Sequence, residues 1–508
     1  ERYSAKWVEL LRDWVAKNPP GTPWSWRTIE AGIRPAAWLR AFFAFSGSPH
    51  FTPADQALLL ASLAEHAEYL MPERRFSRGS NWGIIESVGL LQLGSYLPEF
   101  TQAASWRETA WSRIDAEMLN QVLPDGAQVE LTTSYHFGVL ADFKRAAEIA
   151  QQGGQVIRPE FWQRLERMYD YALCLVKPDG TVPMLGDSWP ANIRGTLAEG
   201  GRRFGRPDLL YVGTAGKEGA PPERLDTSLP DAGYHVFRTS WTDPEAIWLL
   251  TDVAHRWGGG HQHPDALQVV LYAYGKTLTP DTGSYLYYGP GRAAASRTSA
   301  HSTVTVDETN QSTQPAVTNA EGSTATLSLA DGQHPGYPGI VHRRQVLFAR
   351  PTAAAPPYIV VVDHLSGTGR HTLDQAWHFL PGTMILDATR VTARTTNPGP
   401  NVLVQALRQE GLVLEAVPSF VSFSYTKKEE RPAVRFRQQT ELPARFVTLL
   451  LPYPSAAPPN VTARLVTDTA ELVEVEVTGP GFRDRLFAAT APTPLPEVGA
   501  ARAARLHA

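Results

Sequence analysis

The chain has 508 residues, too many for one ordinary hydrophobic core, so we expect two or three domains. Its apolar content of 43% and charged content of 19% are typical of a soluble globular protein, and a net charge of −4 without a basic stripe excludes nucleic acid as a partner. No apolar run approaches about eighteen residues, so no membrane partner is expected, and the first residues lack the pattern of a signal peptide.

The first 200 or so residues predict helices, because apolar residues recur there at helical spacing. The predicted helices recur at irregular intervals without sequence self-similarity, which indicates helical hairpins stacked into a toroid or solenoid. Pro-Asp-Gly at 124–126 and at 178–180 predicts turns. The predicted helices span residues 3–16, 29–45, 53–69, 82–97, 102–122, 135–151 and 159–176.

The pattern changes between about residues 200 and 230, where Gly, Pro and charge predict a linker. The lone Cys174, before this region, is expected to be a buried apolar residue, and it excludes an internal disulfide. Beyond the linker the apolar period is two, which indicates an antiparallel sandwich with strands at 234–238, 246–250, 267–274, 358–363, 446–451 and 472–478. The fold class is therefore α+β and multidomain, with a helical domain at 1–222, a central sandwich at 223–400 and a C-terminal sheet domain at 401–508.

The segment Gly260-His261-Gln262-His263-Pro264-Asp265 is the most informative in the chain. Two histidines at i and i+2 on a strand point to opposite faces, so one is able to bind a metal while the other reaches a substrate. His263, Asp281 and His301 would make a two-His, one-carboxylate site for Zn²⁺ or Mn²⁺, which leaves His261 for proton transfer. A glycine turn with a hydrogen-bonded histidine pair and two unrelated polar residues explains the same letters.

Two polar clusters lie in the helical half. Arg78-Gly79-Ser80-Asn81-Trp82 precedes a predicted helix, and an N-cap at Ser80 or Asn81 would explain it without any catalysis. The segment from Asp125 to His136 contains Glu130, Tyr135 and His136, and a turn followed by a capped helix would explain it equally well. Neither cluster alone is specific.

Together with the central segment, these clusters resemble the heparinase II/III-like polysaccharide lyases, which include glycosaminoglycan lyases and alginate lyases. The order, the spacing and the layout of helices followed by sheets match over roughly residues 75 to 380. The stretches that carry the resemblance are Ser80-Asn81-Trp82-Gly83-Ile84-Ile85-Glu86, Pro124-Asp125-Gly126 through Ser134-Tyr135-His136, Gly260 through Asp265, Thr279-Pro280-Asp281-Thr282-Gly283-Ser284-Tyr285, and Ala300-His301-Ser302-Thr303.

The resemblance implies an incomplete (α/α) toroid joined to antiparallel β-sheets, with an active site in the cleft between them. The implied reaction is β-elimination at a uronic acid. The uronate carboxylate must be neutralised before the weakly acidic C5 proton leaves, and the amide of Asn81 is able to donate to it. Tyr135 and His261 are the candidates for the base and the acid, and which of them is the base stays open.

The sequence departs from many relatives at Trp82, where they carry a histidine that helps to neutralise the carboxylate. Either Arg78, Arg292, Arg297 or His136 supplies another cation, or Trp82 stacks on the sugar and Tyr135 carries both proton transfers. Tyr285 and Tyr287, with the two arginines that follow them, are interpreted as a loop lining the cleft, although tyrosine is also an ordinary strand residue. The resemblance implies that the metal is structural and fixes the loop of His261, whereas the donor set alone equally suits a catalytic Zn²⁺.

The implied substrate is an acidic polysaccharide, with glycosaminoglycans such as heparan sulfate, chondroitin sulfate or hyaluronan slightly favoured over alginate, and the enzyme is expected to be secreted or periplasmic. Endo or exo action and the oligomeric state stay open. One alternative is an (α/α)-toroid glycoside hydrolase that uses two carboxylates. Another is a non-catalytic carbohydrate-binding protein, against which the joint presence of Asn81, Tyr135 and His261 argues. The carboxylates available to a hydrolase are Glu86, Asp125, Glu130, Asp179 and Asp187.

Overall fold

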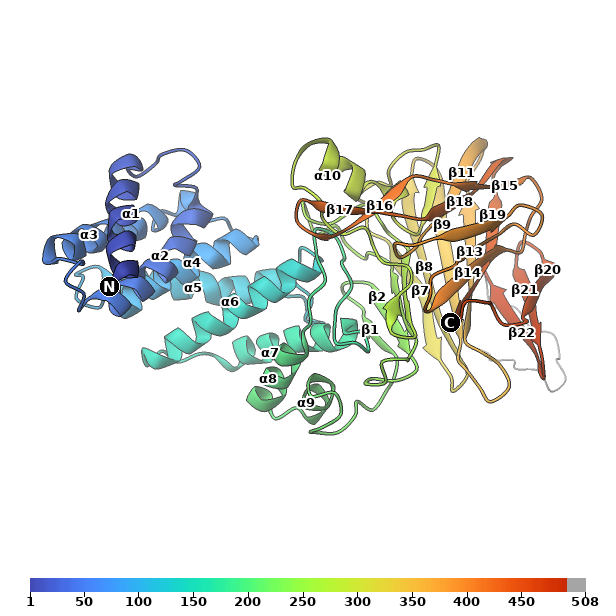
Figure 1. Ribbon diagram of the computed structural model, residues 1–508, viewed down its shortest axis with the longest axis horizontal. Coiled ribbons are helices and arrows are strands. Elements are labelled where there is room, and N and C mark those ends of the chain that lie inside the picture. The colour runs from blue at the N-terminus through green and yellow to red at the C-terminus, as the bar shows by residue number, and fades with distance from the viewer. Residues whose placement is uncertain (491–508) are drawn as a thin grey trace. The chain divides into compact units, whose positions relative to one another are not determined.

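The computed structural model describes residues 1–490 (Figure 1). Residues 491–508, which belong to the predicted C-terminal sheet domain, lie outside that description. The chain divides into two compact units. The helical unit comprises Glu1–Glu130 and Tyr135–Met168, and the sheet unit comprises Leu131–Ser134 together with the chain from Tyr169 onward.

Every long helix predicted from apolar spacing is present, with ends that agree within two residues, and all but the second half of α7 and the first residues of α6 lie in the helical unit. Helix α4 packs against α2, α3 and α5, as expected for helical hairpins stacked side by side. Gly32 and Gly89 permit a close crossing of α2 and α4, because a Cβ on Gly89 would lie 2.3 Å from the carbonyl oxygen of Gly32. The elements are α1 (Arg2–Lys17), α2 (Thr28–Phe45), α3 (Pro53–Leu70), η1 (Glu73–Arg75), α4 (Asn81–Tyr96), α5 (Ala103–Gln121), α6 (Thr133–Gln152) and α7 (Pro159–Leu175).

The predicted linker between residues 200 and 230 is wrong for its first half, because two helices occupy it: α8 (Arg194–Phe204) and α9 (Pro207–Gly213). Its glycines and prolines serve as helix ends. Gly205 takes the left-handed conformation at the C-cap of α8, with φ +65°, and Pro207 is the first residue of α9. Gly213 lies so close to α8 that a Cβ there would meet the backbone nitrogen of Ala198 at 2.3 Å. In this segment Gly and Pro therefore mark the ends of two closely packed helices and not a linker.

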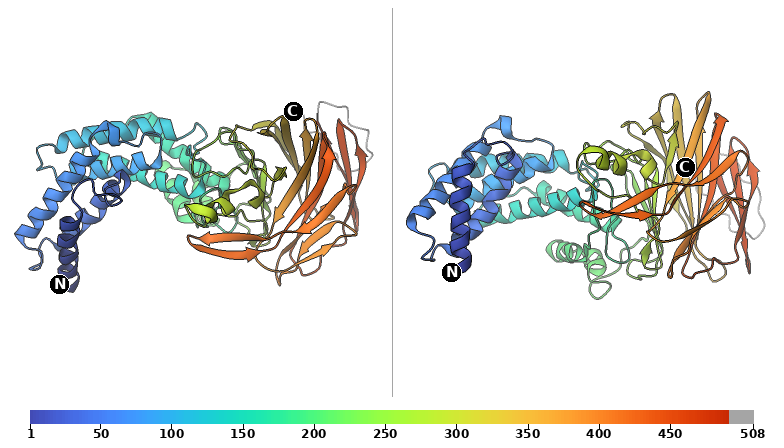
Figure 2. Two further views of the ribbon diagram at one scale, coloured as in Figure 1. Left: turned by 90° about the horizontal axis from the view of Figure 1, so that it is seen from above. Right: turned by 45° about the horizontal axis from the view of Figure 1, so that its top comes forward.

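Antiparallel sheets form the rest of the sheet unit, as predicted from the period of two. The six strands named from the sequence are all present, and the layers of strands are seen in the two views of Figure 2. A five-stranded sheet has the order β1-β2-β3-β4-β5, and an eight-stranded sheet has the order β12-β13-β14-β19-β10-β9-β8-β7. A four-stranded sheet, β15-β18-β11-β6, a hairpin, β16-β17, and a three-stranded sheet, β20-β21-β22, complete the unit.

The strands have the following bounds: β1 (Thr227–Leu229), β2 (Tyr234–Arg238), β3 (Trp248–Asp252), β4 (Gln268–Ala273), β5 (Lys276–Thr277), β6 (Val304–Val306), β7 (Val317–Ser323), β8 (Leu327–Tyr337), β9 (Ile340–Ala349), β10 (Tyr358–Ser366) and β11 (Arg370–His378). They continue with β12 (Met384–Asp387), β13 (Thr392–Thr395), β14 (Asn401–Ala406), β15 (Leu412–Ala416), β16 (Ser419–Ser424), β17 (Lys427–Arg431), β18 (Ala433–Glu441), β19 (Ala444–Tyr453), β20 (Thr462–Asp468), β21 (Leu472–Gly479) and β22 (Phe482–Ala489). Helices α10 (Gly289–Ser296) and η2 (Thr298–Ala300) lie between β5 and β6.

Two apolar clusters hold these layers together. One includes Leu271, Ile359, Trp377 and Phe436, and so joins strands of the five-, eight- and four-stranded sheets. The other packs side chains such as Val475 against the opposite side of the eight-stranded sheet. Because strand residues alternate between two faces, the eight-stranded sheet presents one set of side chains to each cluster.

The domain boundaries expected at residues 222 and 400 stay predictions. Strands β13 and β14, on either side of residue 400, pair with each other in the eight-stranded sheet. Over residues 1–490, no helix combines the length and the apolar content that crossing a membrane requires.

Candidate functional site

Asn81 is the first residue of α4, and Ser80 caps that helix by accepting a hydrogen bond from the backbone N–H of Trp82 at 3.1 Å. The backbone N–H of Asn81 donates to Glu130 Oε1 at 2.9 Å, which fixes the start of the helix. The helix cap is therefore Ser80, and a catalytic role for the side chain of Asn81 is compatible with it. Within residues 1–490, no hydrogen-bond partner takes up the side-chain amide of Asn81, which is half-buried at a helix N-terminus that favours negative charge.

Tyr135 and His136 are neighbours near the start of α6 but have different surroundings. Tyr135 is half-buried. His136 is buried, its Nε2 lies 3.0 Å from the backbone oxygen of Met168, and burial lowers the pKa of the imidazole to about 3. A neutral ring inside the helical unit does not supply the cation for which His136 was one candidate.

The other cationic candidate in the helical unit is Arg78, which is exposed and pairs with Glu73 at 2.7 Å. Trp82 is half-buried, and the guanidinium of Arg27 lies 5.5 Å from the centre of its ring. Arg27, which no sequence pattern indicated, thus makes a cation–π contact with Trp82, the residue that follows Asn81.

In the sheet unit, His261 and His263 do not lie on a strand, so the prediction that they alternate across one is wrong. The segment 257–267 is a loop between β3 and β4. Both rings face the same side chain: His261 Nδ1 lies 3.0 Å from Asp187 Oδ2, and His263 Nε2 lies 3.3 Å from Asp187 Oδ1. The glycines before them, of which Gly259 has φ +102°, allow a loop where apolar alternation is absent.

Asp187 is the central residue that sequence reasoning did not assign to this site, although it stood among the carboxylates of the hydrolase alternative. Besides the two histidines, it accepts hydrogen bonds from Ser284 Oγ at 3.2 Å and from the guanidinium of Arg292. Burial opposes its ionisation, but the hydrogen bonds from His261, His263 and Arg292 outweigh burial and hold its pKa well below the usual range. The carboxylate is thus a fixed anion, while the side chain of His261 keeps 28% of its surface exposed.

The loop and helix after Asp281 supply the remaining predicted residues. The ring of Tyr287 lies edge-on to His261, with centroids 6.0 Å apart, and Arg292 on α10 reaches the backbone oxygen of Gly260 as well as Asp187. Tyr285 instead packs against Phe420, 5.9 Å away, and Arg297 is exposed at the end of α10. Tyr287 therefore contacts His261, and Arg292 contacts Asp187, the partner of His261, whereas Tyr285 contacts Phe420.

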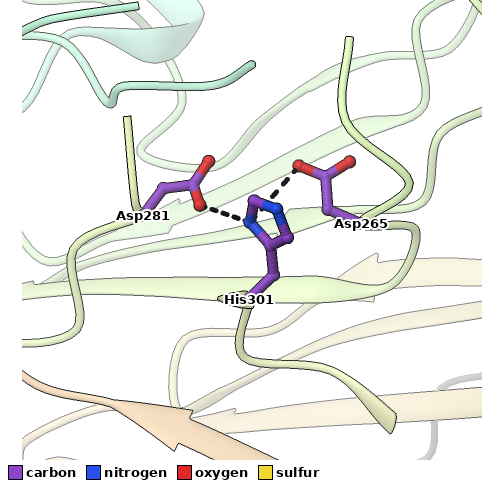
Figure 3. A group of neighbouring side chains, drawn as sticks. All are labelled: Asp265, Asp281 and His301. Carbon is purple, nitrogen blue, oxygen red and sulfur yellow. Dashed lines mark hydrogen bonds and ion pairs between the residues drawn. The ribbon is translucent and has the colours of Figure 1, made fainter. Parts of the chain in front are cut away.

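A second group consists of three buried side chains, Asp265, Asp281 and His301 (Figure 3). Potential ligand atoms of Asp265, Asp281 and His301 all lie within 4.8 Å of one another. His301 Nδ1 is 2.6 Å from Asp281 Oδ1 and 3.9 Å from Asp265 Oδ2. Two of the three predicted metal ligands therefore meet. Asp265 is the third member of the group, and the ring of His263 lies 5.2 Å from that of His301.

The chemistry of this group fits a divalent cation. Asp252, Asp265 and Asp281 are all buried, and burial together with their mutual repulsion raises the pKa of Asp265 and brings that of Asp252 to about 8. For Asp281, burial is outweighed by His301 and His263, which hold its pKa at about 2. In the part of the chain that the structure describes, His301 Nε2, His263 Nδ1 and Asp265 Oδ1 are buried without a hydrogen-bond partner. Such orphaned donors and acceptors are expected where an ion completes the site.

Arg431, at the end of β17, secures the segments that carry Asp281 and His301. Its buried guanidinium donates to the backbone oxygens of Pro280 at 2.6 Å and Ala300 at 3.1 Å, and to Thr282 Oγ1 at 2.8 Å. No sequence pattern indicated this residue, because it lies 130 residues beyond His301 and depends on the hairpin fold.

The chain matches two family descriptions. Residues 1–204 match Heparinase II/III N-terminus, and residues 221–463 match Heparinase II/III-like, C-terminal. A heparin-sulfate lyase of Pedobacter heparinus is 29% identical over 91% of this chain and 72% of its own length, and a heparin-sulfate lyase of Bacteroides stercoris is 28% identical over 94% and 77%. The solved structure of a heparan sulfate lyase mutant from Pedobacter heparinus superposes with a TM-score of 0.77 at 27% identity, covering 97% of this chain and 80% of that one.

These similarities confirm the incomplete (α/α) toroid followed by antiparallel sheets, and they define a polysaccharide lyase. The chain belongs to the heparinase II/III family.

Proposed function

We propose that this lyase cleaves heparan sulfate by β-elimination. The observation that carries the proposal is the pair of His261 and Asp187, a partly exposed imidazole oriented by a buried anion. Support for the substrate comes from the relatives, which are named heparin-sulfate lyases and share most of their length with this chain. A net charge of −4 does not by itself attract an acidic polymer, so recognition must depend on local groups such as Arg78 and Arg292.

Asn81 is assigned to the uronate carboxylate. Its amide donates a hydrogen bond to one carboxylate oxygen, and the N-terminus of α4 adds a favourable dipole for the negative charge that grows when C5 is deprotonated. An amide that no described residue engages is available for this contact without breaking an existing hydrogen bond.

Tyr135 and His261 are assigned to the two proton transfers. A base removes the C5 proton, the electron pair forms a double bond between C4 and C5, the C4–O bond breaks, and an acid protonates the departing glycosidic oxygen. Asp187 contacts Nδ1 of His261 at 3.0 Å and thereby orients the imidazole for this role. Which of the two residues acts as the base depends on the stereochemistry of the uronate.

The metal site is proposed to hold one divalent ion, Zn²⁺ first and Mn²⁺ second, in a structural role. Asp265, Asp281 and His301 supply the three oxygen and nitrogen donors, and His263 is a fourth candidate through its orphaned Nδ1. When bound, the ion would neutralise the carboxylates and rigidify the loop between His261 and Asp265. Asp187 links the two groups, because it contacts both His261 and His263.

The hydrolase alternative loses support from the surroundings of its carboxylates. Glu86, inside α4, accepts two hydrogen bonds from Ser77 and so fixes the segment before the helix, and Asp179 accepts the backbone N–H of Thr181 at 2.8 Å, as expected in a turn. Asp187 is held ionised by a guanidinium, which disfavours a proton-donating role. Three of the five carboxylates available to a hydrolase are thus engaged in contacts that do not suit an acid and base pair across a sugar.

A polymer as large and as charged as heparan sulfate does not cross a bilayer, so the proposed substrate implies an enzyme that is secreted or periplasmic. The test of substrate is incubation with heparan sulfate, chondroitin sulfate, hyaluronan and alginate, followed by ultraviolet absorbance of the unsaturated uronate. Heparan sulfate is expected to give the largest kcat/KM. A larger value for alginate or chondroitin sulfate would contradict the assignment.

A further inference from the structure

The hairpin β16–β17 has no part in the proposed proton transfers. Four of the five residues of β17 are exposed, and only Arg431 at its end is buried, so the hairpin projects from the sheets instead of filling their core. Figure 1 and Figure 2 show it extending beside the segment that leads into α10.

Backbone hydrogen bonds hold the hairpin against the segment that follows Asp281. Ser422 N donates to Thr282 O at 2.9 Å, and Thr426 N donates to Tyr285 O at 2.9 Å. Gly283 makes this approach possible, because a Cβ there would lie 2.6 Å from Ser422 O. The position of the hairpin tip is therefore fixed relative to the loop that carries Tyr287.

The tip places Tyr425 in a cluster of three aromatic rings. Tyr425 lies 5.3 Å from Tyr287 and 6.1 Å from Trp189, and Trp189 lies 6.2 Å from Tyr287. Trp189 is anchored by its Nε1, which donates to Ser284 O at 2.7 Å. Tyr287 in turn contacts the ring of His261, so the cluster reaches the proposed catalytic imidazole.

Exposure separates this cluster from an ordinary core. Tyr425 keeps 47% of its surface exposed, and Trp189 and Tyr287 are half-buried. Rigid aromatic rings left in water beside a reactive group form a surface that gains most by being covered with a ligand. A pyranose suits such a surface, since its axial C–H bonds present a weakly positive apolar face to the electron-rich face of a ring.

We propose that Tyr425, with Tyr287 and Trp189, forms a platform for one pyranose ring of the substrate. That ring is the neighbour of the uronate whose C4–O bond is broken. The placement of this platform next to the reacting sugar depends on the catalytic role proposed for His261. The proposal gives a binding function to the hairpin β16–β17, whose Tyr425 lies 164 residues beyond His261 in the sequence. Tyr425 binds a sugar without taking part in proton transfer, so its loss should weaken binding more than turnover.

The test compares Tyr425→Ala, Tyr425→Phe and a matched control in kinetics with heparan sulfate. Tyr96→Ala is the control, because Tyr96 is similarly exposed at 40% and lies at the opposite end of α4 from Asn81, about 22 Å along the helix. Tyr425→Ala is expected to raise KM about tenfold, the size typical of losing one stacked ring, with kcat changed less than about threefold. Tyr425→Phe and Tyr96→Ala should stay within about twofold of the wild type.

Calorimetry separates this proposal from the proposed function. With Tyr135→Phe as an inactive background, the Kd for heparan sulfate oligosaccharides should rise about tenfold when Tyr425→Ala is added. Equal Kd values with and without that change, or KM shifts no larger than those of Tyr96→Ala, overturn the platform. If the wild type leaves heparan sulfate uncut, the proposed function fails, and the same binding comparison with chondroitin sulfate, hyaluronan and alginate still decides the platform.

Discussion

Asp187→Asn is the substitution that tests the centre of the sheet-unit site. The side chain keeps its shape but loses its charge and one acceptor atom. Arg292 cannot accept a hydrogen bond, so the amide oxygen must face Arg292 and His261, and the amide NH₂ must face Ser284 and His263. Ser284 is able to turn its hydroxyl and accept, and His263 is able to change tautomer.

The cost follows from these contacts. Hydrogen bonds to a charged group contribute about 1.5–3 kcal/mol and neutral ones about 0.5–1.5 kcal/mol, so weakening the bonds from His261 and Arg292 costs roughly 2–3 kcal/mol of folding free energy. The value lies below the 3–5 kcal/mol typical of breaking a fully buried ion pair, because Arg292 keeps 22% of its side chain exposed. The imidazole also loses the anion that orients it, and kcat should fall by about a hundredfold.

Steady-state kinetics on heparan sulfate and thermal unfolding measure the two effects. The matched control is Asp331→Asn, another buried carboxylate of the sheet unit, which binds Arg343 Nε at 2.9 Å and Gln345 Nε2 at 2.9 Å away from the site. Asp331→Asn should lower the melting temperature to a similar extent and leave kcat unchanged. A kcat for Asp187→Asn within about threefold of the wild type would refute the role given to the pair, since it falls far short of the expected range.

Tyr135→Phe should lower kcat by about 10²–10⁴ with an unchanged melting curve, and a variant that keeps a tenth of the wild-type rate would make Tyr135 a packing residue. Asn81→Ala should lower kcat/KM by a similar factor, because the uronate carboxylate loses its donor; an effect on KM alone would show ground-state binding only. Elemental analysis should find one divalent ion per chain, and a strong chelator should lower the melting temperature, by the equivalent of about 4 kcal/mol if the ion is present at a thousand times its Kd; an unchanged melting curve would remove the metal. Burial raises the pKa of Asp142 to about 6, so its contribution to stability is present below pH 4 and is lost as the pH rises through about 6. Asp142→Asn should therefore stabilise the helical unit by up to about 3 kcal/mol at pH 8 and not at pH 4, and equal effects at both pH values would contradict the buried carboxylate.

The helices and strands were predictable because each has a period that its burial requires. Helices such as α1 and α7 show apolar residues at helical spacing on one face, and β2 and β4 lie within a residue of the predicted apolar runs. The helices α8 and α9 were missed because Gly205 and Pro207 have the same composition as a linker, and only their packing shows them to be helix caps.

The candidate site was predictable where its residues lie in short, recognisable segments. Asp281 and His301 lie side by side as expected, because one follows a predicted extended run and the other precedes the next, and the two runs meet in the folded chain. His263 was assigned to the metal and His261 to proton transfer on the assumption of a strand, and the glycine-rich loop removes that alternation. Asp187, Arg431 and Tyr425 join the site from distant segments, and no local period reports such contacts.

The most direct test of the account is the fate of water during cleavage of heparan sulfate. Digestion in water enriched with heavy oxygen, followed by mass spectrometry, distinguishes elimination from hydrolysis. A β-eliminating lyase must give products whose masses sum to that of the substrate, with an unsaturated uronate and no heavy oxygen incorporated. Products that each retain a saturated ring, with one heavy oxygen gained at every cleaved bond, would contradict the account.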